Sequence, residues 1–298
     1  MTRAGEPLGS PEAWPAPGKL NLFLHVVGRR PDGYHLLQTA FQFIDLCDEI
    51  RFWIRPRGVI ERLGHVPGVA PADDLAIRAA RLLAELGQPG TGVAIEVVKR
   101  LPMQGGVGGG SSDAATALVA LNEVWGLALS DDELARLALQ LGADVPVFVR
   151  RQAAWAEGVG EVLTPAEFPE PAYLLVRPDA AVVTAEIFKA PELTRDSPVI
   201  TIRGFLMTGG RNDCEPVVRR RYPAVAQALD WVGHLAPARL TGTGSCVFAA
   251  MPDEEVAQAA LGRLPGRWQG WVVRGLNRSP LADRRLLEQR GRSAERGR

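Results

Sequence analysis

The spacing of apolar residues predicts alternating strands and helices from residue 19 onward. Residues 19–27 are expected to form a strand because leucines occupy every second position from residue 20. Residues 73–86 are expected to form a helix, with an aspartate as its cap and Gly87 as its stop. Further strands are expected at 34–45, 49–54, 93–98 and 145–149, and further helices at 114–125 and, behind a capping box, at 131–142.

A proline-rich stretch interrupts this pattern and predicts a domain junction. Three of the seven residues at 165–171 are prolines, which suits a linker better than a strand or a helix. Alternating elements resume beyond it, at 173–176, 223–232, 246–251, 254–264 and 271–273. We therefore expect two α/β domains, at 14–165 and 171–283, flanked by a disordered lead-in at 1–13 and a frayed, arginine-rich tail after residue 287.

Composition narrows the class of protein. Hydrophobic residues make up 46% of the 298 residues, enough for substantial cores, and a formal net charge of zero argues against nucleic-acid binding through bulk charge. The three cysteines lie far apart, which predicts free thiols in a reducing compartment, and the four histidines lack metal-ligand spacing. Neither a membrane-spanning run nor a signal-peptide core is evident. These features predict a soluble cytoplasmic protein, and no obligate protein partner is evident.

Five glycines at 105–110 form the most informative stretch of the chain. They follow a predicted strand and precede a predicted helix. Glycines let backbone N–H groups approach an anion, and a helix N-terminus adds unpaired N–H groups and a positive dipole end. Ser111 and Ser112 are expected to cap that helix. The loop lacks the lysine of a Walker A motif and the spacing of a dinucleotide fold, so it predicts another kind of phosphate site; the alternative is a flexible linker.

Three other sites carry candidate chemistry. Lys19 and Asn21 open an otherwise apolar strand, and Asp144 lies in a run of small and apolar residues. Residues 241–245 form a glycine turn rich in hydroxyl groups. Each site has an ordinary alternative: a solvated edge lysine, a capping aspartate and a hairpin turn. A buried carboxylate is costly unless it is paired or functional, which favours a role for Asp144.

Residues 17–21, the glycine loop through Ser112 and residues 241–245 together resemble the three motifs of the GHMP small-molecule kinases. The resemblance extends over about residues 14–281. It implies an α/β (α+β) fold with an N-terminal ATP-binding domain of the ribosomal S5 domain 2-like type, a ferredoxin-like C-terminal domain, and an active site between them. The stretches at 19–24, 30–35, 142–146, 187–189 and 212–215 are similar to members that use ATP to phosphorylate the 2-hydroxyl of a cytidyl-linked methylerythritol in non-mevalonate isoprenoid biosynthesis.

The resemblance also implies roles for the matched residues. Asp144 would accept the proton of the substrate hydroxyl or hold it in line, and Lys19 would orient that hydroxyl and offset phosphoryl charge. Tyr34, His35 and Phe188 would bind the cytosine ring. The ATP phosphates would bind at Pro102, Met103, Gly105, Gly106, Val107, Gly108, Gly109, Gly110, Ser111 and Ser112. Other substrate contacts would come from Asn21, Thr184, Asp213, Gly242 and Thr243. Mg²⁺ is expected with ATP, held mostly by phosphate oxygens and water, because no carboxylate cluster is evident.

Several alternatives stay open at this point. Tyr34 and Phe188 would be plain core aromatics if no base binds there. The chain would be another GHMP kinase, acting on homoserine, mevalonate or a sugar, or else a non-catalytic ligand sensor or a phosphate-binding structural protein. The base-slot residues favour a nucleotide-linked substrate, and the presence of both Lys19 and Asp144 favours an enzyme. Gln104 departs from the glycine of the family pattern and would be strained by about 1 kcal/mol at positive φ.

Overall fold

Two long antiparallel strands run through the structure. The computed structural model describes residues 5–8, 12–87 and 89–296. β1 (Trp14–Arg29) pairs with β2 (His35–Arg55) along most of its length. The other elements, in chain order, are β3 (Ile60–Leu63), α1 (Leu75–Gly87), β4 (Gly92–Val98), α2 (Gly109–Trp125), α3 (Asp131–Leu139), α4 (Val145–Arg150), β5 (Ala154–Glu157), β6 (Val162–Pro165), β7 (Ala172–Arg177), α5 (Thr184–Lys189), α6 (Ile202–Thr208), α7 (Glu215–Arg221), α8 (Pro223–Gly233), β8 (Arg239–Leu240), β9 (Val247–Met251), α9 (Glu254–Leu261), β10 (Gln269–Leu276) and α10 (Pro280–Arg296).

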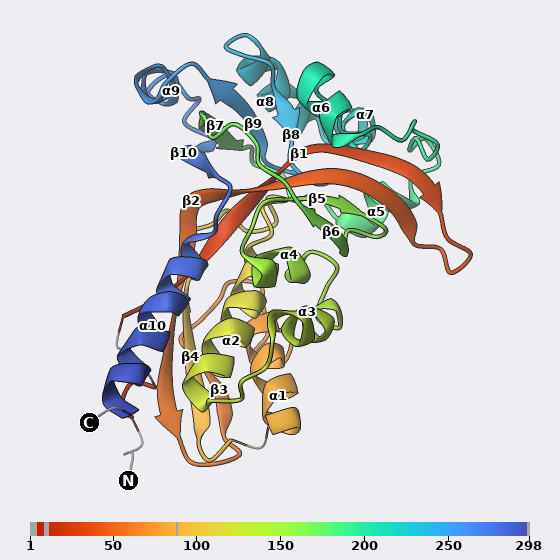
Figure 1. Cartoon of the computed structure of the whole chain (residues 1–298). Helices are drawn as coiled ribbons and strands as arrows, with labels where there is room; N and C mark the ends of the chain where they lie inside the picture. Colours follow the sequence, from red (N-terminus) through yellow and green to blue (C-terminus); the bar gives the residue numbers. More distant parts are fainter. Residues whose placement is uncertain (1–4, 9–11, 88, 297–298) are drawn as a thin grey trace.

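The strands form one connected sheet within the described residues, in the order β3-β4-β2-β10-β7-β9-β8. β1 and β5 also pair with β2, and β6 pairs with β5. Figure 1 shows the β1–β2 pair crossing the molecule, with α1–α4 on one side of it and α6–α9 on the other. β10 joins the two halves because it pairs with both β2 and β7. The division into domains at 14–165 and 171–283 stays a prediction.

β2 corrects the expectation of separate strands at 34–45 and 49–54. The polar residues between them interrupt the alternation but not the strand. The register of β1 against β2 shifts there, and β10 pairs with β2 at Phe43 and Ile44. Asp48 is fully buried, and its carboxylate accepts the backbone N–H groups of Arg100 and Leu101. Pairing partners far along the chain therefore keep this polar segment extended, which local alternation could not predict.

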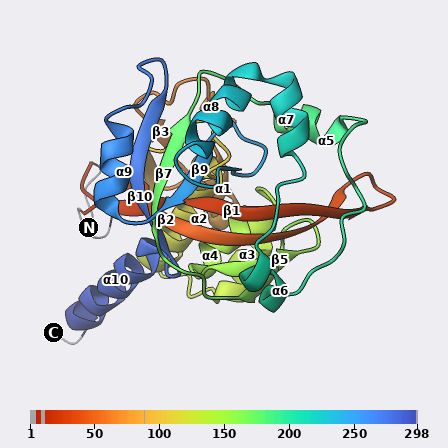
Figure 2. The ribbon, with the colours of Figure 1, turned by 90° about the horizontal axis from the view of Figure 1, so that it is seen from above.

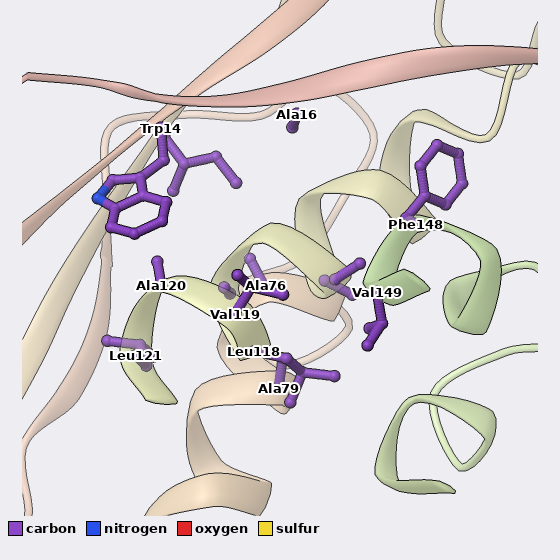
Figure 3. Packing of buried hydrophobic residues seen from close by; sticks show 14 of the residues in the cluster. Trp14, Ala16, Ala76, Ala79, Leu118, Val119, Ala120, Leu121, Phe148 and Val149 are labelled. Atoms are coloured by element: carbon purple, nitrogen blue, oxygen red, sulfur yellow. The ribbon is translucent and has the colours of Figure 1, made fainter. Parts of the chain in front are cut away.

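Helix α2 lies at the centre of the core below the sheet. Residues 112–122 are all buried, and the alanines among them let α2 pack closely against α1 and β1. Figure 3 shows Trp14 of β1 directed toward Ala120 of α2, and Ala76 of α1 belongs to the same core cluster. Apolar residues on all sides of a helix are expected where the helix is buried, and seven of these eleven residues are apolar. This packing fixes the N-terminus of α2 directly beneath the glycine loop.

Helix α4 occupies residues 145–149, where a strand was expected, so that prediction was wrong. The run is short and wholly apolar, and such a run carries no periodicity that separates a strand from a helix. Pro146 lies in the first turn of α4. Its fixed φ suits that position and it needs no N–H donor there, so it favours a helix. The correction places Asp144 at the N-cap position of α4, although its side chain makes no capping hydrogen bond.

Both ends of the chain are more ordered than expected where the structure describes them. Residues 5–8 lie along β2, with Leu8 buried and Pro7 bridged to Trp53; residues 1–4 and 9–11 lie outside the description. The tail after residue 287 is helical as far as residue 296, so the expectation of fraying was wrong. Figure 2 shows α10 extending from the body of the molecule. Two arginines in its first half have partners: Arg285 pairs with Glu123 and Asp131, and Arg284 lies over the Trp14 ring.

The other expected elements occur, with bounds shifted by a few residues. The capping box at Ser130 and Glu133 is present, and the Asp74 side chain accepts the Ala76 N–H at the start of α1. Helices α5, α6 and α7 were not expected. Each has six or seven residues, too few to produce a recognisable helical period.

Candidate active site

The glycine loop joins β4 to α2 and adopts backbone angles that favour glycine. Gly106 and Gly108 have φ of 75° and 74°. A Cβ at Gly106 would lie 2.2 Å from the carbonyl oxygen of Thr241, so a side chain is excluded there. Gly108 is the N-cap of α2, and Ser111 and Ser112 lie inside its first turn, so the expectation that the serines cap this helix was wrong. Gln104 has φ of 55°, the strained conformation anticipated for it.

Backbone and side-chain hydrogen bonds bring the three predicted motifs together. The Lys19 N–H donates to the Val107 carbonyl at 2.9 Å, which docks β1 on the glycine loop. Thr241 Oγ1 donates to the Gly106 carbonyl at 3.2 Å and accepts the Asn21 N–H at 3.1 Å. The Cys246 N–H donates to the Gly105 carbonyl at 3.0 Å. One threonine thus links the first and third motifs to the loop.

Lys19 lies at the point where these motifs meet. Its side chain is 3% exposed, and its Nζ lies 3.3 Å from Asp144 Oδ2. Nζ donates to the Gly106 carbonyl at 3.1 Å and to Asn21 Oδ1. Asn21 Nδ2 donates in turn to Thr39 Oγ1 at 2.9 Å. The lysine is therefore fixed by acceptors on three sides, whereas the Asp144 side chain is 37% exposed.

A cavity of about 410 Å³ lies beside the loop. Glycine-loop residues and the first turn of α2 form one wall, and residues 66–69 and 73–75 form another. The first N–H groups of a helix have no intrahelical partners and carry the positive end of its dipole. The predicted phosphate-binding residues Pro102, Met103, Gly105, Gly106, Val107, Gly108, Gly109, Gly110 and Ser111 all line this cavity. Ser112 is fully buried behind it. The cavity is thus chemically suited to an anion such as a polyphosphate.

The predicted base-binding residues are brought together in part. The His35 and Phe188 rings lie 5.2 Å apart at 30°. Tyr34 is 65% exposed, so it is not a core aromatic, and its stacking on a base stays a prediction. Thr184 and Thr243 share a hydrogen bond of 2.8 Å between their hydroxyl groups. Gly242, at φ of 57°, lies in the turn beside them.

Asp213 is engaged inside the protein. Its carboxylate accepts the Val26 N–H at 2.7 Å, the Ser197 hydroxyl at 2.5 Å and the Arg211 Nε at 2.8 Å. These bonds tie the start of α7 to β1, and the side chain is 2% exposed. A substrate contact by Asp213 stays a prediction, but the observed bonds are structural.

A buried ionic cluster near the loop was not anticipated. Lys99 donates to Asp48 and, at 2.7 Å, to Asp113 near the start of α2. Burial raises the pKa of Asp113 to about 7, against the opposing charge of Lys99. In the sequence, this cluster is indicated by a lysine at the end of an apolar strand and an aspartate at the start of an apolar helix. Lys99 and Asp48 are more than 50 residues apart in the chain, so the sequence does not indicate that they form a pair.

The described residues offer neither a metal-binding cluster nor a membrane-spanning helix. No group of three or more His, Cys, Asp or Glu side chains in the described part of the chain is arranged to hold a metal ion. Nor does any helix among the described residues have the length and apolarity to cross a membrane. The three cysteines are free thiols.

Similarity to known proteins agrees with this geometry. The family model of the GHMP kinases N terminal domain matches residues 74–152, and that of the GHMP kinases C terminal matches residues 202–269. The 4-diphosphocytidyl-2-C-methyl-D-erythritol kinase of Nitrosococcus oceani is 57% identical over 278 residues, or 93% of this chain and 99% of the relative. The protein of the same name from Halorhodospira halophila is 58% identical over 274 residues, or 90% of this chain and 94% of the relative.

Solved structures support the same assignment. A crystal structure of a 4-(cytidine 5'-diphospho)-2C-methyl-D-erythritol kinase matches with a TM-score of 0.78 at 30% identity, over 88% of this chain and 98% of that one. Methanococcus jannaschii mevalonate kinase shares the fold, with a TM-score of 0.66 at 18% identity over 90% of this chain and 99% of that one. The predicted two-part GHMP kinase fold is confirmed. With relatives more than half identical over at least 90% of its length, this chain belongs to the 4-diphosphocytidyl-2-C-methyl-D-erythritol kinase family of the GHMP kinases.

Proposed function

We propose that the protein transfers the γ-phosphoryl group of ATP to the 2-hydroxyl of 4-diphosphocytidyl-2-C-methyl-D-erythritol, a step of non-mevalonate isoprenoid biosynthesis. The observation that carries this proposal is the Lys19–Asp144 ion pair of 3.3 Å, which adjoins Gly106 at the wall of the cavity. A carboxylate and an ammonium group beside a phosphate-binding loop are the groups that an alcohol kinase requires.

Each group has a distinct task in the transfer. Asp144 is open enough to reach the substrate hydroxyl and accepts its proton while the hydroxyl oxygen attacks the γ-phosphorus. The bond from that phosphorus to the bridging oxygen of ADP breaks, and ADP leaves. Lys19, fixed by Gly106 and Asn21, holds positive charge beside the transferring group without having to move. Positioning and charge stabilisation supply most of the rate in such reactions.

ATP would bind in the cavity, with its phosphates against the N–H groups at residues 109–111. Mg²⁺ would shield the phosphate charge, held mainly by phosphate oxygens and water. Asp113 fits this ion, because it lines the cavity and its Oδ1 has no hydrogen-bond partner in the part of the chain that the structure describes. The free thiols favour a reducing, cytoplasmic location, and the neutral net charge disfavours nucleic-acid binding through bulk charge.

A coupled assay of ADP release tests the substrate. The cytidyl-linked methylerythritol should support turnover, whereas mevalonate, homoserine and galactose should not, because they offer no base to the His35–Phe188 pair. Turnover with one of these three and none with the cytidyl compound would assign the chain to another GHMP activity.

The Gly108→Val variant is expected to lose ATP binding. A Cβ at this position would lie 2.8 Å from the Phe148 ring and 3.2 Å from Lys19 Cε, in addition to the strain of a φ of 74°. The loop or Lys19 must then shift. We expect ATP affinity, measured by calorimetry, to fall by about tenfold or more, the effect of losing one or two charge-assisted hydrogen bonds.

Gly58→Val is the matched control. Gly58 has a similar φ of 83° but no atom within 4 Å of its Cβ position, and it lies outside the cavity. It carries the same backbone strain without the collision. Equal ATP affinity in the Gly108 variant and wild type would show that the loop is not the phosphate site.

The His35→Ala variant is expected to weaken binding of the cytidyl substrate and leave ATP affinity unchanged. Loss of hydrogen bonds to a bound base costs about 1–3 kcal/mol. Calorimetric titration with CDP and with ATP separates the two effects, and His65→Ala, at an exposed position, serves as the control. Equal losses for both ligands would contradict the base-site assignment.

A further inference from the structure

Arg195 connects His35 to the segment that carries Phe188, two of the residues proposed to hold the base. Its Nε donates to His35 Nε2 at 3.1 Å, from the segment after α5 to the first residue of β2. Its two terminal nitrogens donate to backbone carbonyls of the same segment, at 3.1 Å for Phe188, 2.6 Å for Ala190 and 2.9 Å for Leu193. The guanidinium group thus holds the Phe188 backbone and the His35 ring in one fixed arrangement.

The direction of the Arg195–His35 hydrogen bond determines which imidazole nitrogen of His35 carries the proton. A guanidinium group has only donors, so His35 Nε2 must be the acceptor. A neutral imidazole that accepts at Nε2 carries its proton on Nδ1. Burial, and then the positive charges of Arg195 and Arg29, lower the pKa of His35 and favour this neutral form. His35 Nδ1 has no hydrogen-bond partner among the described residues, so it is available to donate to a ligand.

We propose that Arg195 is a positioning residue that fixes His35 as the Nδ1–H tautomer, and that this donor selects cytosine over uracil. This inference rests on the proposed function. Cytosine presents an acceptor at N3, whereas uracil presents an N–H donor at the same position. A fixed Nδ1–H donor pairs with the first and opposes the second. Sites that hydrogen-bond a polar group discriminate strongly against an analogue that leaves the site unpaired.

Binding of CDP and UDP to the full chain tests the specificity. We expect wild type to bind CDP about tenfold or more tighter than UDP, as expected for one favourable bond replaced by an opposed pair. Arg195→Met keeps length and removes the donors, so the CDP-to-UDP preference should fall to within about threefold, near the value for an unspecific contact. Arg195→Lys retains a group that only donates and should restore most of the preference.

Arg221→Met is the matched control for loosening the same segment. Arg221 pairs with Glu192 at 2.9 Å and does not contact His35. The Arg221→Met variant should leave the CDP-to-UDP preference unchanged. An equal loss of preference in the Arg221 and Arg195 variants, or an unchanged preference in Arg195→Met, would overturn the inference.

The tautomer can be read directly in nitrogen-15 NMR spectra of histidine-labelled protein. The chain has four histidines, and the His35 signals are identified by their loss in His35→Ala. We expect Nδ1 to be protonated in wild type and the Nε2–H form to gain population in Arg195→Met. A wild type that binds CDP with His35 protonated on Nε2 would overturn this inference alone. Failure of wild type to bind CDP would overturn the proposed function and the specificity with it.

Discussion

Asp144→Asn is expected to lower turnover by about 10²–10⁴, the usual contribution of a general base. The asparagine keeps the shape of the side chain but cannot accept the proton of the substrate hydroxyl. ATP affinity should hold or increase slightly, because a negative charge near the γ-phosphate is removed. Affinity for the cytidyl substrate should persist, because its base would bind at His35 and Phe188. Steady-state assays and calorimetric titrations with each ligand measure these quantities separately.

Asp132→Asn makes the same chemical change outside the site. The Asp132 carboxylate is 75% exposed and pairs with Arg150 on the surface, so turnover of the Asp132→Asn variant should match that of wild type. If Asp144→Asn turned over within about threefold of wild type, a general-base role would be excluded. Asp144 would then be only the residue that precedes α4, and the mechanism would need another proton acceptor.

Lys19→Met is expected to lower turnover by about 10²–10³, the usual loss when one fixed donor to a developing negative charge is removed. Methionine fills the buried space of the lysine chain but leaves Asn21 Oδ1 and the Gly106 carbonyl without this donor. The loop should therefore hold ATP less tightly as well. Single-turnover rates and ATP dissociation constants report the two effects.

Lys19→Arg should not restore this activity, even though it keeps the charge. The space around Lys19 is limited, because its side chain is 3% exposed and its Nζ is held by acceptors on Asp144, Asn21 and Gly106. The larger planar guanidinium group would displace the loop. Thermal unfolding of each variant distinguishes loss of function from loss of fold. A Lys19→Met enzyme with near-normal turnover and a normal unfolding midpoint would show that the ammonium group does not stabilise the transferring phosphoryl group.

Local patterns determined the elements whose signal lies within a few residues. The capping box at Ser130 and Glu133 and the helix behind Asp74 were predictable, because each depends on neighbouring backbone and side chains. The wrong predictions arose where that signal was ambiguous. The five apolar residues at 145–149 fit a strand and a helix equally well. The polar residues in the middle of β2 interrupt the alternation that would indicate one continuous strand.

The sequence by itself identified the glycine loop, marked Lys19 and Asp144 as candidate functional side chains, and predicted a fold of alternating helices and strands. Only the tertiary structure decided their partners. Arg195 meets His35 across 160 residues, and Thr241 meets the Gly106 carbonyl across 135. Such contacts depend on sheet pairing and helix packing, which bring distant segments together without any local mark in either one. The tertiary structure therefore decides the state of a side chain such as His35, because its tautomer depends on which distant group donates to it.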